Sequence, residues 1–148
     1  DCTHLFFIDD DVVPPAGALA RLLAVNRPVA TGLYPISMHG RFVACVRGLH
    51  DADWPETWPR EVFPIKQCGL GCALVQRETF ERIGFPWFAW PEEEDGTNVG
   101  EDVWFCRRVS KAGLQIFCDG SVVCEHVKNS FDLASVWRAR EAADSAGQ

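Results

Sequence analysis

Residues 5–15 read LFFIDDDVVPP, four apolar residues followed by three aspartates, two valines and a proline pair. An apolar run this short and continuous is typical of a strand buried on both faces, as in a parallel sheet. Residues 16–25, AGALARLLAV, then place leucines at helical spacing, and proline is favoured where a helix begins. The stretch therefore predicts a strand, an acidic turn and a helix in succession.

The remaining segments alternate between strand and helix patterns. Strand patterns lie at residues 28–34, 41–49, 68–75, 114–118 and 122–127. Helix patterns lie at residues 77–83, 101–112 and 133–143. Dense prolines make 50–64 an irregular loop, and the aromatic, then acidic, segment 85–100 is expected to be a mobile loop. The alternation predicts an α/β fold with a mixed, mostly parallel sheet flanked by helices, in a single domain over residues 1–148.

The composition excludes several classes of protein. Of 148 residues, 47% are hydrophobic and 24% are charged, as in a globular domain rather than a disordered or fibrous chain. No apolar run approaches the ~18–20 residues of a membrane span, and no signal peptide opens the sequence. The net charge of -7 argues against a nucleic-acid partner, which usually requires a basic footprint. Clustered carboxylates suit cations, so an anionic ligand would need a metal ion between itself and the protein.

The seven cysteines include no C-x-x-C pair, and most of them lie inside apolar runs. We expect them to be small buried hydrophobic side chains in a reducing compartment, which predicts a cytoplasmic location. A structural zinc site is the alternative, because Cys68 and Cys72 have a C-x-x-x-C spacing, although no second pair matches it.

The triplet Asp9, Asp10 and Asp11 is a candidate metal site. In open α/β sheets, ligands bind beyond the carboxyl ends of the strands, where this triplet is expected. Alternation places Asp9 and Asp11 on one side and Asp10 on the other, and two converging carboxylates repel unless a cation lies between them. Hard divalent cations with oxygen ligands meet that need. A solvated turn with a helix-capping aspartate is the simpler alternative.

A second candidate is Glu101 and Asp102, at the start of the expected helix. At about 100° per residue, Asp102 lies on the side of an apolar stripe. The stripe consists of Phe105, Cys106, Val109 and Ala112. An inward carboxylate in the first turn could act as a general base, ionised by the helix N-terminus and made more basic by partial burial. The alternative is an acidic residue that only complements the helix dipole.

Three further features are less specific. His126 is either a structural histidine or a nitrogen ligand, and imidazole favours a transition metal such as manganese. The aromatic residues of 85–90 can pack in the core or against the face of a sugar ring. The glycines of CGLGC, residues 68–72, indicate a close approach of the backbone to another group. That segment has neither the lysine nor the spacing of a phosphate-binding loop.

Four stretches, in this order, resemble the second half of a family-2-type glycosyltransferase with the A-type nucleotide-sugar (GT-A) fold. They are FFIDDDVVPP, GLGCALVQRETFERIGF, GEDVWFCRRVSKAGLQIFCD and VVCEHV, and they cover most of residues 5–127. The resemblance implies a partial catalytic domain that lacks the N-terminal, nucleotide-binding half. It implies metal-dependent transfer of a sugar from a nucleotide-sugar donor to a hydroxyl acceptor, a saccharide or other small molecule, with the E-D pair favouring inversion.

The resemblance also implies roles for individual residues. Asp11, with Asp9 and His126, would bind a divalent metal, Mn2+ in preference to Mg2+. Asp102 would deprotonate the acceptor hydroxyl, and Glu101 would support it or contact the acceptor. The residues expected to contact the nucleotide-sugar donor are Asp9, Asp10, Gly69 and Gly71.

Other interpretations stay open at this point. A non-catalytic binding or scaffold module could retain part of the glycosyltransferase fold without turnover, and a metal-dependent hydrolase is a further alternative. Loss of the first strands would leave a sheet edge unpaired, which predicts self-association into a homo-oligomer through that edge.

Overall fold

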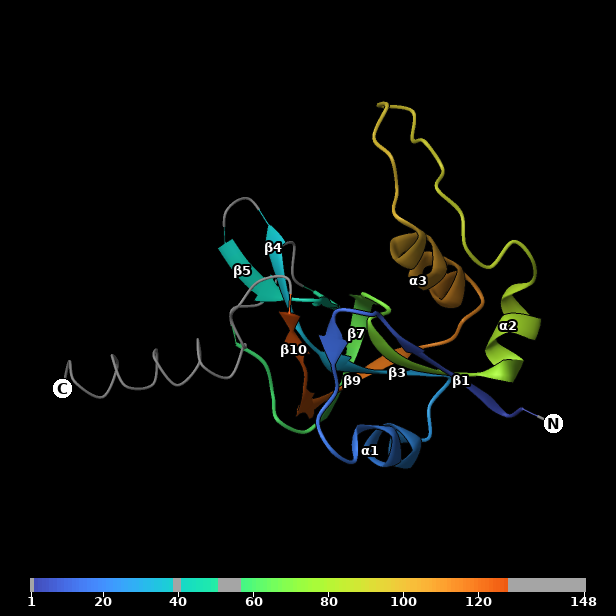
Figure 1. Ribbon diagram of the computed structural model, residues 1–148. Coiled ribbons are helices and arrows are strands. Elements are labelled where there is room, and N and C mark those ends of the chain that lie inside the picture. Colours follow the sequence, from blue (N-terminus) through green and yellow to red (C-terminus); the bar gives the residue numbers. More distant parts are fainter. Residues whose placement is uncertain (1, 39–40, 51–56, 128–148) are drawn as a thin grey trace.

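The structure is a computed structural model, and it describes residues 2–38, 41–50 and 57–127 (Figure 1). Within these residues the fold is α/β, with a mixed six-stranded sheet and three helices. The helix predicted over 133–143 lies outside the described residues. No helix in the described part of the chain is long and apolar enough to cross a membrane.

The central sheet has the strand order β1-β8-β3-β9-β7-β6. Its strands are β1 (His4–Ile8), β3 (Val29–Leu33), β6 (Val46–Gly48), β7 (Val62–Cys68), β8 (Cys72–Gln76) and β9 (Ile116–Val123). Two smaller ladders accompany it, which are β2 (Val12–Val13) with β10 (Glu125–His126), and β4 (Pro35–Met38) with β5 (Arg41–Ala44).

The prediction that the sheet is mostly parallel is wrong. β3 and β9 pair in parallel, whereas the other neighbouring strands of the sheet pair antiparallel. The continuous apolar runs arise because both faces are covered, a property that carries no information about strand direction. β8 follows β7 after residues 69–71, too short a connection for a parallel crossover, and it lies between β1 and β3. Since both pair antiparallel with β8, strands β1, β3 and β9 run in one direction, with their carboxyl ends at one edge of the sheet.

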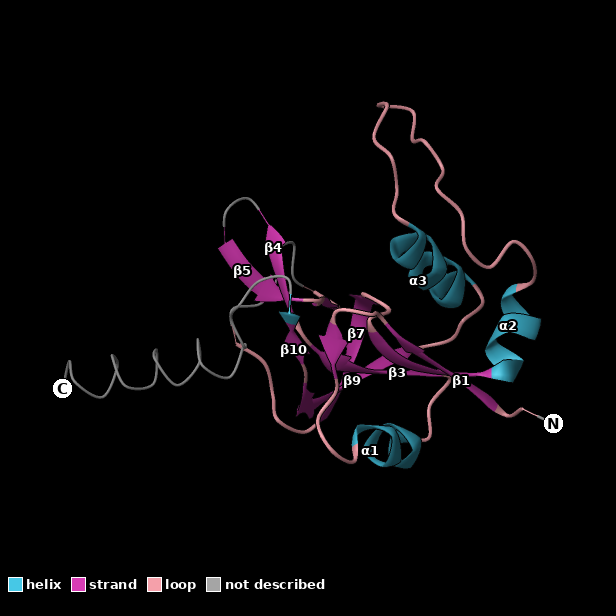
Figure 2. Ribbon diagram, in the orientation of Figure 1, coloured by secondary structure: helices cyan, strands magenta, loops and turns pink. Residues whose placement is uncertain are grey.

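Helices cover both faces of the sheet. Figure 1 shows α1 (Ala18–Val25) on one side, and α3 (Glu101–Lys111) with α2 (Arg77–Ile83) on the other. Figure 2 shows the same layers by secondary structure. The covering explains why every residue of β3 is buried. The predicted apolar stripe of α3 is confirmed, because Phe105, Cys106 and Val109 are all buried.

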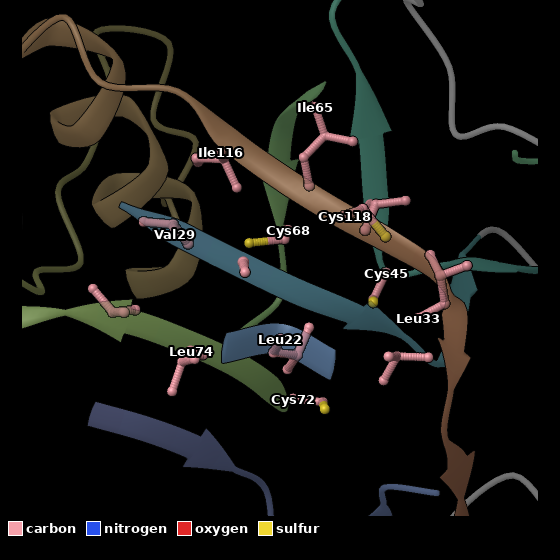
Figure 3. Packing of buried hydrophobic residues seen from close by; sticks show 14 of the residues in the cluster. Leu22, Val29, Leu33, Cys45, Ile65, Cys68, Cys72, Leu74, Ile116 and Cys118 are labelled. Atoms are coloured by element: carbon pink, nitrogen blue, oxygen red, sulfur yellow. The ribbon is translucent and has the colours of Figure 1, made fainter. Parts of the chain in front are cut away.

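The buried cysteines are part of the core, as Figure 3 shows for Cys45, Cys68, Cys72 and Cys118. All seven cysteines are free thiols, six of them buried and Cys2 exposed. Burial raises the pKa of the Cys45 thiol to about 12, so this group stays neutral and behaves as a small apolar side chain. The expectation of buried hydrophobic cysteines is therefore confirmed for these six, whereas the cytoplasmic location stays a prediction.

Two predicted strand boundaries differ from the structure. The strand expected over 41–49 is divided at Cys45 into β5 and β6, which belong to different sheets. The end of the loop expected over 50–64 belongs to β7, even though it contains Pro64. Proline has no N–H group to donate. It is tolerated there because β6 pairs with β7 only from Ile65 onwards, so no hydrogen bond from residue 64 to β6 is required.

Strand β1 lies at one edge of the sheet formed by the described residues. Its side chains Leu5 and Ile8, on opposite faces of the sheet, are 40% and 48% exposed, which is a large fraction for apolar residues of a strand in the central sheet. An edge strand of this kind can pair with another chain. Self-association through β1 remains a prediction.

Candidate functional site

Side chains that follow three strands of like direction meet at one edge of the sheet. Asp9 directly follows β1, Tyr34 directly follows β3, and His126 lies just beyond β9. The loop 69–71 enters β8 beside the end of β1, where the Asp9 N–H donates to the Gly71 carbonyl at 3.1 Å. This edge is the place where open α/β sheets bind their ligands.

Asp11 and His126 face each other across this edge. The short ladder between β2 and β10 brings them together, with the Asp11 Oδ2 to His126 Nε2 distance at 3.4 Å. The other ring nitrogen, Nδ1, lies 2.6 Å from the Pro35 carbonyl oxygen. Because a carbonyl only accepts, Nδ1 carries a proton. In the neutral imidazole, Nε2 therefore presents its lone pair to a carboxylate that is itself only an acceptor.

That arrangement is stable when a positive charge lies between the two groups or on the ring. A backbone carbonyl that holds one ring nitrogen of a histidine is the usual support of a metal-ligating imidazole. Nitrogen and oxygen ligands lie about 2.0–2.2 Å from a divalent ion such as zinc, so one cation can contact two atoms separated by 3.4 Å. Among the described residues, no three His, Cys, Asp or Glu side chains are grouped so that they could hold a metal ion. The role of Asp9 as a metal ligand stays a prediction.

Tyr34 lies between the glycine loop and His126 and contacts both. Its side chain is buried, its hydroxyl accepts a hydrogen bond from the Gly71 N–H at 3.1 Å, and its ring meets that of His126 edge-on at 5.6 Å between centroids. A Cβ on Gly69 would lie 2.0 Å from the Tyr34 hydroxyl oxygen, and one on Gly71 would lie 2.8 Å from an Asp9 carboxylate oxygen. The close approach indicated by the two glycines is therefore to the phenol and to Asp9.

Asp102 approaches the same glycine loop from the first turn of α3. Its Oδ1 accepts a hydrogen bond from the Val103 N–H at 2.7 Å, and its Oδ2 would lie 3.7 Å from a Cβ on Gly69. Burial raises the pKa of the Asp102 carboxyl, and the nearby charges of Glu101 and Asp9 add to that rise, while the Val103 hydrogen bond partly opposes it. A carboxylate in this state is more basic than an ordinary aspartate.

Asp9 connects the two sides of the site electrostatically. Partial burial raises its pKa, and the charges of Asp11, Asp10 and Glu101 raise it further, whereas His126 lowers it. Asp10 itself is exposed in the turn between β1 and β2. The carboxylates predicted from two separate stretches of sequence thus interact through space.

The segment 85–100 contains a short hairpin beside α3. Glu92 and Asn98 form an isolated antiparallel bridge, and the Val99 N–H donates to the Pro91 carbonyl at 2.9 Å. An ion pair between Glu93 and Arg107 ties this hairpin to α3. The base of the hairpin lies next to Gly100, where the helix begins.

Comparison with solved structures finds a crystal structure of A197 from STIV. The match has a TM-score of 0.59 at 24% sequence identity, and covers 84% of this chain and 57% of that chain. At this identity the similarity shows a shared fold, and this chain spans just over half the length of the A197 chain. Neither the models of protein families nor the curated proteins give a match.

The structure thus brings together Asp9, Asp11, Glu101, Asp102, His126, Gly69 and Gly71 at one edge of the sheet. Sequence reasoning missed Tyr34, which contacts both the glycine loop and the imidazole. A signal was present, because Tyr34 is the one tyrosine of the sequence and ends an otherwise apolar strand pattern. A buried phenol at the carboxyl end of a strand needs a polar partner there.

Proposed function

We propose that this edge of the sheet catalyses transfer of a sugar from a nucleotide-sugar donor to a hydroxyl acceptor. The observation that supports it best is the convergence of a half-buried carboxylate, Asp102, with the Asp11–His126 pair around one glycine loop. The sequence resemblance to GT-A glycosyltransferases supports the same activity.

Asp11 and His126 would hold the divalent ion, Mn2+ or Mg2+. Their geometry suits that role, because the Pro35 carbonyl fixes the proton on Nδ1 and leaves Nε2 directed at Asp11. The remaining ligands would come from donor oxygens and water. When bound, the ion would act as a Lewis acid that neutralises charge on the diphosphate leaving group. Without it, a chain of net charge -7 would repel such a donor.

Asp102 would take the proton of the acceptor hydroxyl. Its Oδ1 is held by the Val103 N–H, so Oδ2, on the side of Gly69 and Asp9, is the oxygen available to accept it. Glu101 would keep that carboxylate basic, because its charge favours the protonated form of its neighbour. Attack from the side opposite the leaving group would then invert the anomeric carbon.

Asp9 and Asp10 would contact the donor directly, whereas Gly69 and Gly71, which are buried, would support the donor site from beneath. The Gly69 N–H already donates to the Cys45 carbonyl at 2.8 Å, and the Gly71 N–H donates to Tyr34. The glycines would therefore shape the site by making room for Asp9 and the Tyr34 phenol, while Asp9 and Asp10 provide hydrogen-bond acceptors for ribose hydroxyls.

Calorimetric titration of the 148-residue chain tests the proposal. We expect Mn2+ to bind, UDP to bind only when Mn2+ is present, and Asp11→Asn to weaken both by about tenfold or more. The matched control is Glu78→Gln, which removes the same charge from the exposed first turn of α2. UDP binding without Mn2+, or unaltered in Asp11→Asn, would contradict the proposal.

An assay for glycoside product and released sugar distinguishes the enzyme from a non-catalytic binding module. Such a module would bind UDP with Mn2+ but would form no glycoside product with any hydroxyl acceptor and release no sugar from UDP-sugars. Transfer or slow Mn2+-dependent hydrolysis of UDP-glucose, lost in Asp102→Asn, would support the enzyme.

A further inference from the structure

The hairpin beside α3 presents an exposed indole next to the site. Trp90 is 69% exposed, although large aromatic side chains are usually buried. Its neighbours in sequence are fixed, because the Val99 N–H holds the Pro91 carbonyl and Glu93 is paired with Arg107. The exposed ring is therefore placed on an anchored piece of backbone.

Trp90 and Asp102 flank the same glycine. A Cβ added to Gly100 would lie 4.0 Å from Cζ3 of Trp90 and 3.1 Å from Oδ1 of Asp102. The edge of the indole and the carboxylate therefore lie close together beside Gly100, at the start of α3. One bound sugar unit can contact both groups.

The other exposed aromatic residues of the segment have different surroundings. Trp87 donates its indole N–H to the Phe80 carbonyl at 3.1 Å, and its ring packs edge-on against Phe80 at 5.4 Å. Phe85 is 83% exposed and contacts Trp87 edge-on at 5.9 Å. The contacts of Trp87 are structural, and Phe85 provides a matched exposed aromatic residue on the same segment.

The chemistry of this corner indicates a neutral pyranose. A pyranose with equatorial hydroxyls presents a face of C–H groups, and the positive edges of C–H bonds are attracted to the negative face of an indole. Exposed carboxylates of Glu92, Glu94 and Asp95 surround the tip of the hairpin, and they would repel a uronate or a phosphate.

We propose that Trp90 is the platform on which a neutral pyranose of the acceptor stacks, so that its hydroxyl reaches Asp102. This inference rests on the proposed function for its catalytic meaning, because it assigns the acceptor class to the same site. It also makes a claim about saccharide binding that needs no turnover. Trp90 would determine affinity for the acceptor and would leave donor and metal binding unchanged.

The test is a titration observed by nuclear magnetic resonance on the 15N-labelled chain. The indole N–H signal of Trp90 is assigned by its loss in Trp90→Phe, and the probes are cellotetraose, mannotetraose and chitotetraose. We expect at least one to shift this signal, and Trp90→Ala to weaken its binding about tenfold, while Trp90→Phe retains part of the affinity. Phe85→Ala should bind as the unaltered chain does, and cellobiouronic acid should bind less well than cellobiose.

The outcomes separate this inference from the proposed function. If no probe shifts the Trp90 signal while UDP and Mn2+ bind through Asp11, the platform is wrong and the transferase proposal stands. If a probe binds through Trp90 but no Mn2+-dependent donor binding occurs, the saccharide platform stands and the transferase proposal is wrong. Equal affinity of Trp90→Ala and Phe85→Ala for a bound probe would overturn the platform. Where transfer is measurable, Trp90→Ala should raise the acceptor KM more than it lowers kcat.

Discussion

The two sides of the candidate site differ in their electrostatic surroundings. On one side, Asp11 faces an imidazole whose second nitrogen is fixed by the Pro35 carbonyl. On the other, Asp102 has Glu101 and Asp9 as its charged neighbours, and burial raises its pKa. The two aspartates thus have different environments. That of Asp11 is suited to holding positive charge, and that of Asp102 is suited to accepting a proton. The residue type, aspartate in both cases, does not by itself distinguish these roles.

The largest predicted effect separates the two sides by substitution. Asp102→Asn should lower transfer by about 10²–10⁴-fold, the usual contribution of a general base, while Mn2+ binding stays unchanged. His126→Ala should weaken Mn2+ binding by at least the ~10–100-fold that follows loss of a supporting partner. Product formation and calorimetric Mn2+ titration measure the two effects.

Two results for Asp102→Asn would contradict the assignment of separate roles to Asp11 and Asp102. A loss of Mn2+ affinity in Asp102→Asn would show that the two carboxylates form one metal site. Full transfer activity in the same variant would remove Asp102 from the role of base. Glu78→Gln is the control for loss of one negative charge far from the site.

An intermediate effect concerns the loop between the two sides. Gly69→Ala should destabilise the fold by about 1–3 kcal/mol, because the new methyl group would overlap the Tyr34 hydroxyl. Adding Tyr34→Phe should recover part of that loss, although on its own it removes the acceptor of the Gly71 N–H and is destabilising. Urea denaturation of both single variants and the double variant gives the coupling energy. Additive effects would show that Tyr34 does not set the glycine requirement.

The smallest effect is a pH dependence of stability. The folded-state pKa of Asp102 is raised, so below the unfolded-state pKa of about 3.9 both states are protonated and the residue has no effect on stability. Between that value and the raised folded-state pKa, the unfolded chain ionises while the half-buried carboxyl keeps its proton, so the free energy of unfolding falls as the pH rises, and above the folded-state pKa it levels off. Asp102→Asn should therefore raise the Tm at pH 7, by about 2–4 °C per kcal/mol relieved, and leave it unchanged near pH 3.

Thermal melts in the presence of a chelator, between pH 3 and 8, measure this difference. A Tm of Asp102→Asn below that of the unaltered chain at pH 7 would mean that the carboxylate stabilises the fold. Asp102 would then only complement the dipole of α3, the alternative that the sequence left open.

Periodicity predicted the parts of the fold that depend on local burial. α2 has the predicted bounds, and α3 buries the predicted stripe, because an amphipathic pattern reflects which face meets the core. Strand direction depended on the insertion of β8 between β1 and β3, a long-range pairing that no local pattern encodes. The site follows the same division. Asp9 and Asp102 were identifiable from position and spacing, whereas the contact of Tyr34 with the glycine loop needed three dimensions.

The position of β8 between β1 and β3 has a consequence for how the chain acquires its fold. In the described sheet, β1 pairs with β8, from His4 opposite Gln76 to Ile8 opposite Cys72. These hydrogen bonds can form only after β8, which lies more than 60 residues later in the chain, has been synthesised. Contacts of such high sequence separation slow folding, and the apolar LFFI segment stays uncovered meanwhile. Nascent chains that stop before residue 72 should therefore aggregate, and ribosome-bound chaperones should bind this segment during synthesis.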